Sequence, residues 1–127
     1  MKIKLTGASG GEVTGSAYVV RTRRATILVD AGMFQGGRQS EAKNRLPAGA
    51  RPDEIDAVLL THAHLDHTVR LPLLFKHGFA GPVYATGATI DLAEIILKDS
   101  ARIQSQDAQR KSRKAVQRDL PPAVACG

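Results

Sequence analysis

The sequence has little of what several classes of protein need. It contains no tryptophan, and aromatic residues make up only 4% of its 127 residues, so a hydrophobic core must consist mainly of aliphatic side chains. Its single cysteine, Cys126, excludes an internal disulfide framework and favours a reduced, cytoplasmic setting. No apolar run is long enough for a membrane span, and the first residues do not have the apolar segment of a signal peptide.

What the sequence does contain fits a small globular protein. Hydrophobic residues make up 43% and charged residues 24%, and the length suits one domain with a modest core. Short β-branched runs alternate along the chain with segments of helical periodicity, which predicts the α/β class. We expect strands over residues 2–6, 17–22, 25–30, 56–61 and 81–86, and helices over about 69–78 and 87–114.

Loops of distinct composition separate these elements. Residues 7–16 contain four glycines, and residues 31–37 form a glycine-flanked segment. Residues 38–52 are polar with two prolines, so we expect them to be irregular with a helical turn. The runs 17–22 and 25–30 have only two residues between them, which predicts a hairpin.

The net charge of +6 is concentrated near the end of the chain. The stretch RKSRKAVQR, residues 110–118, carries five basic side chains, and such a segment attracts a partner with phosphate groups. A solvated helix end followed by a loose tail explains the same residues without any partner. Both interpretations stay open at this point.

The eight residues THAHLDHT, 61–68, contain three of the four histidines of the chain and an aspartate. His62 and His64 are two residues apart, so both imidazoles lie on the same face if the strand before them continues. Asp66 and His67 follow where the chain must turn into the next helix. Imidazole and carboxylate ligands suit zinc, and also manganese or iron.

Two pairs of ligands suggest two metal ions held side by side. Such ions, about 3.5–4 Å apart, can bridge a hydroxide and clamp both oxygens of a phosphodiester displacement. A histidine-rich surface loop or an accidental cluster is the alternative. Three histidines and an aspartate directly after a buried strand are hard to explain in that way.

HAHLDH resembles the H-x-H-x-D-H signature of the metallo-β-lactamase fold, which implies a partial αββα sandwich with a mixed sheet and flanking helices. By this resemblance His62 and His64 bind a first metal, and Asp66 and His67 bind a second. Asp66 is then also the catalytic residue that orients the attacking water. Asp30, which ends the ILVD strand, matches the upstream aspartate that supports the metal-binding loop by hydrogen bonding. Its alternative is a plain turn aspartate.

The blocks GGEVTGSAYVV, ILVDAGMFQGGRQSE, THAHLDHTVRLPLL and GPVYATGATIDLAEIILKDSARIQ resemble the β-CASP branch, a group of RNA-processing ribonucleases. The resemblance runs over nearly all of residues 3–110. It implies hydrolysis of RNA by a hydroxide that two divalent ions activate, with zinc as the expected metal. Val69 stands where the family usually has glycine. Since a β-branched residue does not easily take positive φ, we expect an altered turn there.

The resemblance also implies ligands that have no counterpart in this sequence: a further histidine on a later strand, a bridging aspartate and a last histidine. His77 is predicted to end a helix, and Cys126 lies in the tail. Residues 1–110 are therefore predicted to be the N-terminal half of a metallo-β-lactamase domain, and 111–127 a basic, irregular tail. A truncated or frameshifted reading frame would explain this. Uncovered sheet and helix faces would then favour self-association.

Three hypotheses for function follow. The first is a metal-dependent ribonuclease with RNA as its partner, although activity of this chain is uncertain because part of the metal site has no counterpart. The second is an inactive fragment that binds metal weakly. The third is a hydrolase of the same superfamily that acts on a thioester or a lactam. The blocks VTGS, GRQSE and DSARIQ resemble the RNA-processing branch and favour the first.

Overall fold

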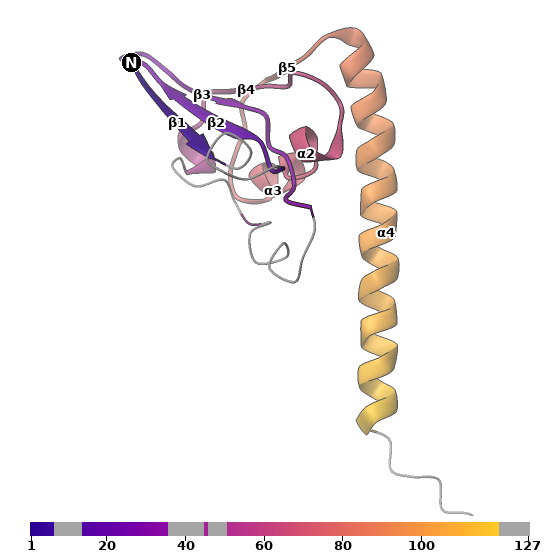
Figure 1. The fold of residues 1–127 in the computed structure, drawn as a ribbon. Coiled ribbons are helices and arrows are strands. Elements are labelled where there is room, and N and C mark those ends of the chain that lie inside the picture. Colours follow the sequence, from indigo (N-terminus) through magenta and orange to yellow (C-terminus); the bar gives the residue numbers. More distant parts are fainter. Residues whose placement is uncertain (7–13, 36–44, 46–50, 120–127) are drawn as a thin grey trace, which may run out of the picture. The chain divides into compact units, whose positions relative to one another are not determined.

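We describe a computed structural model of the chain, and the description covers residues 1–6, 14–35, 45 and 51–119. Within these residues, five strands form one sheet in the order β1–β2–β3–β4–β5 (Figure 1). The first three strands pair antiparallel and the last three pair parallel, so the sheet is mixed, as the resemblance implied. The strands are β1 (Lys2–Thr6), β2 (Ala17–Arg21), β3 (Thr26–Val29), β4 (Ala57–Leu59) and β5 (Val83–Tyr84).

All five predicted strands are present, and four of them are shorter than predicted. The hairpin between β2 and β3 shows the reason. The hydroxyl of Thr22 accepts hydrogen bonds from the backbone N–H groups of Arg24 and Ala25, at 3.2 and 3.0 Å, so the turn includes residues assigned to the strands. Such a side-chain bond replaces the strand pairing at the ends of the hairpin. The glycine-rich loop 7–16 and the segment 38–52 lie mostly outside the described residues, apart from the 3₁₀ turn Pro52–Glu54.

The two faces of the sheet differ. On one face, Val19, Leu28 and Val58 are neighbours across β2, β3 and β4, and each is at most 2% exposed. They belong to the same core cluster as Leu71 and Leu74 of the helix α3 (Leu71–Lys76). Strand residues of the other face include four large apolar side chains that are exposed, which we call the exposed sheet face. They are Ile3, Leu5, Leu59 and Tyr84.

The helices after β4 agree with the prediction in their main features. The one-turn helix α2 (Leu65–Thr68) precedes α3, which has Pro72 in its first turn, where a missing N–H costs nothing. His77 is the C-cap of α3, as predicted, and Gly78 follows with φ +105°. Val69 takes an ordinary helical φ of −69°, so the turn between the helices needs no glycine.

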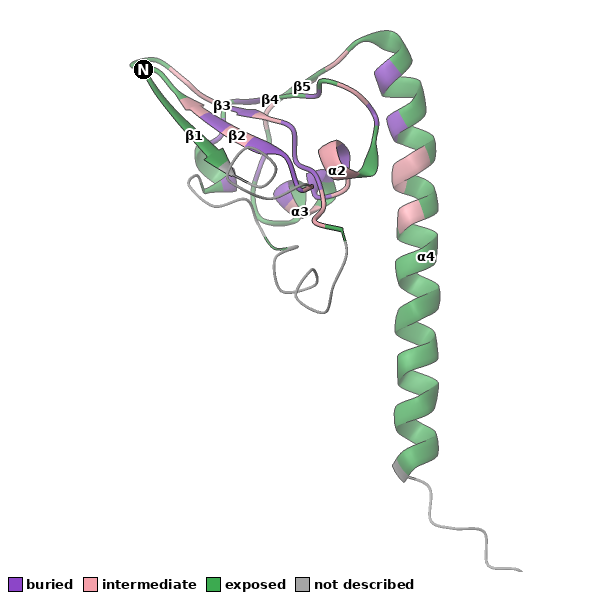
Figure 2. Ribbon diagram, in the orientation of Figure 1, coloured by how far each residue is buried: buried purple, intermediate pink, exposed green. Residues whose placement is uncertain are grey.

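The chain divides into two compact units, Met1–Leu97 and Lys98–Gly127, and the helix α4 (Gly87–Asp119) contributes to both. In the first unit Thr86 is its N-cap, since the Thr86 hydroxyl accepts a hydrogen bond from the Thr89 N–H at 3.3 Å. Ala93 is buried, and Leu97 packs against the core. In the second unit, every described side chain from 101 to 118 is exposed (Figure 2).

The helix α4 corrects one prediction. It continues to Asp119, whereas we expected it to end near 114 and the basic tail to be irregular from 111. Residues 111–119 contain no glycine or proline, and the next proline along the chain is Pro121, so nothing in the sequence stops the helix earlier. Residues 120–127 lie outside the described part of the chain.

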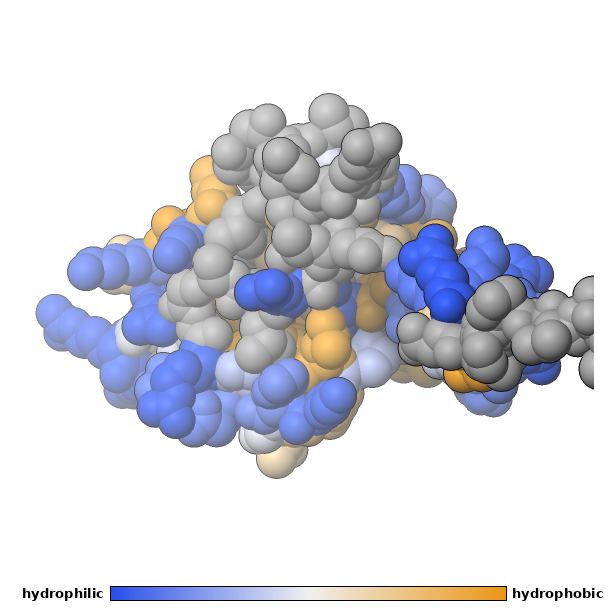
Figure 3. Space-filling view, turned by 90° about the horizontal axis from the view of Figure 1, so that it is seen from below, coloured by the Kyte–Doolittle hydropathy of each residue, from blue (hydrophilic) through white to orange (hydrophobic). Residues whose placement is uncertain are grey.

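Seen from below in Figure 3, hydrophilic side chains cover most of the visible described surface, with smaller apolar areas between them. None of the helices in the described ranges combines the length and the apolar character that crossing a membrane requires.

Candidate metal centre

The predicted site residues lie where two parallel strands end. Because β3 and β4 run parallel, their carboxyl ends meet at the same edge of the sheet. Asp30 directly follows β3, and Thr61 lies two residues beyond β4. From Thr61 the chain passes through residues 62–64 into α2, which brings the histidine cluster to the same edge.

The Asp30 carboxylate connects the ends of the two strands. It accepts the Thr61 N–H at 2.8 Å on Oδ1, and it accepts the Thr61 hydroxyl at 2.7 Å and His67 Nδ1 at 2.8 Å on Oδ2. Asp30 is 1% exposed and has φ +61°, a conformation that aspartate tolerates better than most residues. The hydrogen bonds that the resemblance implied for Asp30 are therefore present, while its support of a bound metal stays a prediction.

These bonds fix the form of the His67 ring. A carboxylate only accepts, so Nδ1 of His67 carries the proton and donates it to Asp30. The other ring nitrogen, Nε2, lies 3.4 Å from Oδ2 of Asp66. In the neutral ring Nε2 is an acceptor, and two acceptors then face each other. A cation between them, either a metal ion or a second proton on the ring, satisfies both.

His62 completes a group of three potential ligands. One ligand atom from each of His62, Asp66 and His67 lies within 4.8 Å of the other two, and all three residues are half-buried. The rings of His62 and His67 are 3.9 Å apart between centroids. Two imidazole nitrogens and a carboxylate oxygen form a set that zinc accepts, with a fourth position left for water. The chemistry of the described residues therefore fits a divalent metal.

His64 lies beside this group but is not part of it. Its ring meets the His62 ring edge-on, with 4.7 Å between centroids, and the residue is exposed. The sequence predicted His62 and His64 as one pair and Asp66 and His67 as the other. The structure brings His62 together with Asp66 and His67, and the assignment of each residue to a first or second metal stays a prediction.

The backbone of α2 is held by loops that the sequence did not connect to the site. Gly32 lies against it so closely that a Cβ atom there would be 1.4 Å from the Asp66 carbonyl oxygen. The glycine-flanked segment 31–37 was a visible signal, but nothing in the sequence showed what its glycine approaches. The carbonyls of α2 accept hydrogen bonds at 2.8–3.1 Å from three backbone N–H groups, those of Ser16, Ala31 and Met33.

Arg70 is a second residue that the sequence analysis missed. It is 3% exposed, and its guanidinium donates to backbone carbonyls of Gly15, Gly32 and Arg45, three separate segments of the chain. Desolvation lowers the pKa of Arg70 to about 10, so the side chain stays charged at neutral pH. Arg70 therefore joins the loops that surround the metal centre without pointing at the ligands.

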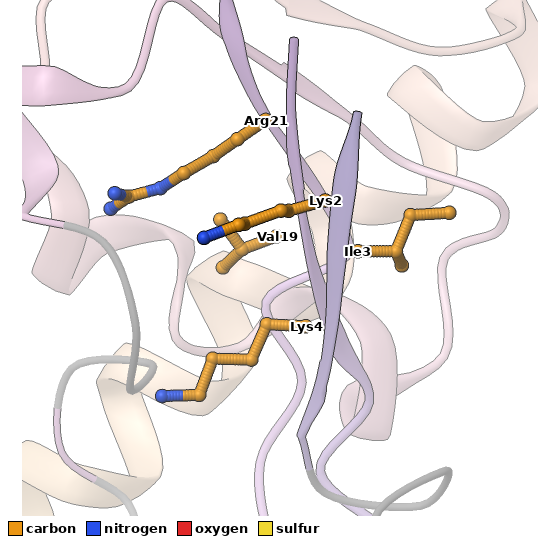
Figure 4. A pocket seen from close by; sticks show the side chains of 5 residues that line it. All are labelled: Lys2, Ile3, Lys4, Val19 and Arg21. Atoms are coloured by element: carbon orange, nitrogen blue, oxygen red, sulfur yellow. The ribbon is translucent and has the colours of Figure 1, made fainter.

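A pocket of about 470 Å³ lies elsewhere in the first unit. Lys2, Lys4 and Arg21 extend along one side of the β1–β2 pair around Val19, and Ile3 points to the other side (Figure 4). β1 is an edge strand, and lysines on an edge strand hinder its pairing with a strand of another chain. None of the four predicted ligands, His62, His64, Asp66 and His67, is among the residues that line this pocket.

Comparisons with known proteins identify the family and the fold of the chain. A family profile described as the metallo-beta-lactamase superfamily matches residues 10–124. The chain therefore belongs to the metallo-β-lactamase superfamily. Its five-stranded mixed sheet with helices is a partial metallo-β-lactamase fold, as the sequence predicted. The metallo-beta-lactamase fold protein YhfI from Bacillus subtilis matches with a TM-score of 0.50 and 23% identity, over 70% of this chain and 39% of that chain, and supports the fold alone.

Within the superfamily, the chain is homologous to β-CASP ribonucleases. It is 54% identical over 95 residues to Ribonuclease TTHA0252 from Thermus thermophilus, which is 75% of this chain and 22% of the relative. It is 40% identical over 105 residues to the transcription termination factor FttA from Cenarchaeum symbiosum, which is 80% of this chain and 16% of the relative. The chain thus spans about a fifth of the length of these relatives.

Proposed function

We propose that the chain provides metal-binding and catalytic residues of a β-CASP-type hydrolase that cleaves RNA phosphodiester bonds. The observation that carries the proposal is that ligand atoms of His62, Asp66 and His67 lie close together. Hydrogen bonds orient both imidazoles: His67 is bonded to Asp30, and His62 to the Thr61 hydroxyl, which is itself bonded to Asp30. The identity to a protein named a ribonuclease supports RNA as the substrate. Hydrolysis of a thioester or a lactam, and weak metal binding without catalysis, remain outcomes that the test separates.

Each residue has a defined part in this proposal. His62 and His64 hold a first divalent ion and Asp66 and His67 a second, zinc being the metal that the donor set suits. Bound ions of this kind supply hydroxide near neutral pH, because they lower the pKa of coordinated water. Asp66 orients the attacking water toward phosphorus, and Asp30 keeps Nε2 of His67 directed at the centre.

The 127-residue chain alone tests the metal site. Zinc should bind weakly, since each ion receives only two protein ligands from this cluster, whereas catalytic zinc usually has three. Calorimetric titration of the wild-type chain, of Asp66→Asn and of the matched control Asp91→Asn measures this. Asp91 is an exposed acid in the first turns of α4, so its replacement should leave the zinc affinity unchanged.

A chimera tests the chemistry. The matching residues of this chain replace the corresponding 95-residue segment of the Thermus ribonuclease, which the 54% identity makes structurally compatible. We expect metal-dependent cleavage of a labelled single-stranded RNA by the chimera, no cleavage after Asp66→Asn, and retained cleavage after Asp91→Asn. The 127-residue chain alone should show no cleavage. A chimera that hydrolyses a thioester or a lactam but leaves RNA intact contradicts the proposal.

A further inference from the structure

Thr61 lies between the Asp30 carboxylate and the His62 ring. Its hydroxyl is 2.7 Å from Oδ2 of Asp30 and 3.0 Å from Nδ1 of His62, and its N–H donates to Oδ1 of Asp30 at 2.8 Å. The two contacts of the hydroxyl form a continuous chain of hydrogen bonds from the buried carboxylate to the imidazole.

The donors in this chain can be assigned by elimination. Asp30 offers only acceptors, so the single hydroxyl proton of Thr61 is donated to Asp30. The Thr61 oxygen can then only accept from His62, which requires a proton on Nδ1 of the ring. Nε2 of His62 is consequently left with a free lone pair, as a metal ligand must be.

His62 is connected to the Asp30 carboxylate in the same way as His67, except that the Thr61 hydroxyl lies between them. His67 Nδ1 donates directly to Asp30, and His62 Nδ1 reaches the same carboxylate oxygen through the Thr61 hydroxyl. Threonine suits this position because its β-branched side chain has few allowed rotamers, and its backbone N–H is already bound to Asp30.

We propose that Thr61 is a positioning residue that selects the Nδ1–H tautomer of His62 and thereby directs the Nε2 lone pair into the ligand group. The purpose of this arrangement rests on the proposed metal-dependent function, but the tautomer itself exists without metal. Histidine in water prefers the opposite tautomer, with the proton on Nε2, so the hydroxyl must reverse an intrinsic preference.

The simpler interpretation gives Thr61 a structural role only. In that case its hydroxyl satisfies Asp30 at the end of β4, and its loss lowers stability without changing the His62 ring. The two interpretations predict different nitrogen spectra of the metal-free protein.

The test is long-range ¹H–¹⁵N correlation NMR of the four histidine rings in the metal-free 127-residue chain at mildly alkaline pH. The His62 signals are identified by their loss in His62→Gln. We expect the Nδ1–H pattern for His62 in the wild type and in Thr61→Ser, and a mixed or Nε2–H pattern in Thr61→Val. Thr22→Val is the matched control, because the Thr22 hydroxyl also bridges neighbouring groups but lies in the hairpin turn.

Zinc affinity provides the second readout. Loss of a group that orients a ligand typically costs about 10–100-fold in metal affinity, so we expect that loss in Thr61→Val and not in Thr61→Ser or Thr22→Val. An Nε2–H pattern in the wild type overturns the proposal even if Thr61→Val does not fold. So does an unchanged His62 pattern in folded Thr61→Val. Absence of zinc binding to the wild type counts against the proposed metal function, while the tautomer result still decides the role of Thr61.

Discussion

Replacing Asp30 with asparagine should weaken both the fold and the metal centre. The two side chains have nearly the same shape, and asparagine also tolerates the φ of +61°, so the change removes charge and one acceptor without adding backbone strain. The carboxylate accepts three hydrogen bonds, two on Oδ2 and one on Oδ1. An amide has a single oxygen, so at least one of these three donors must lose its acceptor.

The loss of unfolding free energy in Asp30→Asn can be worked out for the orientation of the amide that keeps the most hydrogen bonds. With the amide oxygen in the Oδ2 position, the Thr61 hydroxyl and His67 stay bound, and the Thr61 N–H faces an NH₂ group. A hydrogen bond to a charged group is worth about 1.5–3 kcal/mol, and the two remaining bonds weaken to about half when the acceptor is neutral. Relief of the buried charge offsets part of this loss. We therefore expect the unfolding free energy to fall by about 2–4 kcal/mol, a large share of the typical 5–15 kcal/mol.

Urea denaturation measures the stability of Asp30→Asn, and calorimetry with zinc measures its affinity, which should fall by about 10–100-fold. Asp56→Asn is the matched control. Its carboxylate accepts one backbone N–H, that of Thr26 at 2.7 Å, and the residue is exposed, so both measurements should change little. If Asp30→Asn unfolds at the wild-type urea midpoint and binds zinc as tightly as the wild type, the role given to Asp30 is refuted.

Three further predictions concern the backbone, the ligands and the surface. Gly32→Ala should lower the unfolding free energy by about 3 kcal/mol, because the added Cβ would overlap a carbonyl oxygen of α2. Gly87→Ala is the control and should not lower it, since the space around Gly87 is open, and urea denaturation compares the two variants. His62→Ala should abolish zinc binding at the first of the two proposed sites in calorimetry, while His77→Ala should keep both, and full stoichiometry without His62 would disprove the ligand assignment. The exposed sheet face should cause self-association, reduced by Leu59→Lys; a clean monomer at all concentrations in analytical ultracentrifugation would contradict this.

The sequence predicted the elements of the fold better than their ends. β-branched runs predict strands, and apolar residues at helical spacing predict helices. Every predicted strand and both predicted helices are found in the structure. The ends depend on single side chains. The Thr22 hydroxyl shortens the hairpin strands, and the absence of glycine or proline between Gly87 and Pro121 lets α4 continue beyond its expected end.

In the candidate site, too, some residues could be predicted from the sequence and others could not. His62, Asp66 and His67 could be predicted because the types of ligand and their spacing are visible within one short segment. Gly32 and Arg70 could not, since their importance comes from contacts with segments 34 and 38 residues away in the chain. Local sequence shows which groups are available for chemistry, and only the tertiary structure shows what holds them in place.

The same distinction explains why Asp30 matters more than its place in the sequence suggests. It lies 31 residues from Thr61 and 37 from His67, so no local pattern connects it to either. In the structure, one buried carboxylate contacts Nδ1 of His67 directly and reaches Nδ1 of His62 through the Thr61 hydroxyl. The positions of both imidazoles therefore depend on a single buried charge.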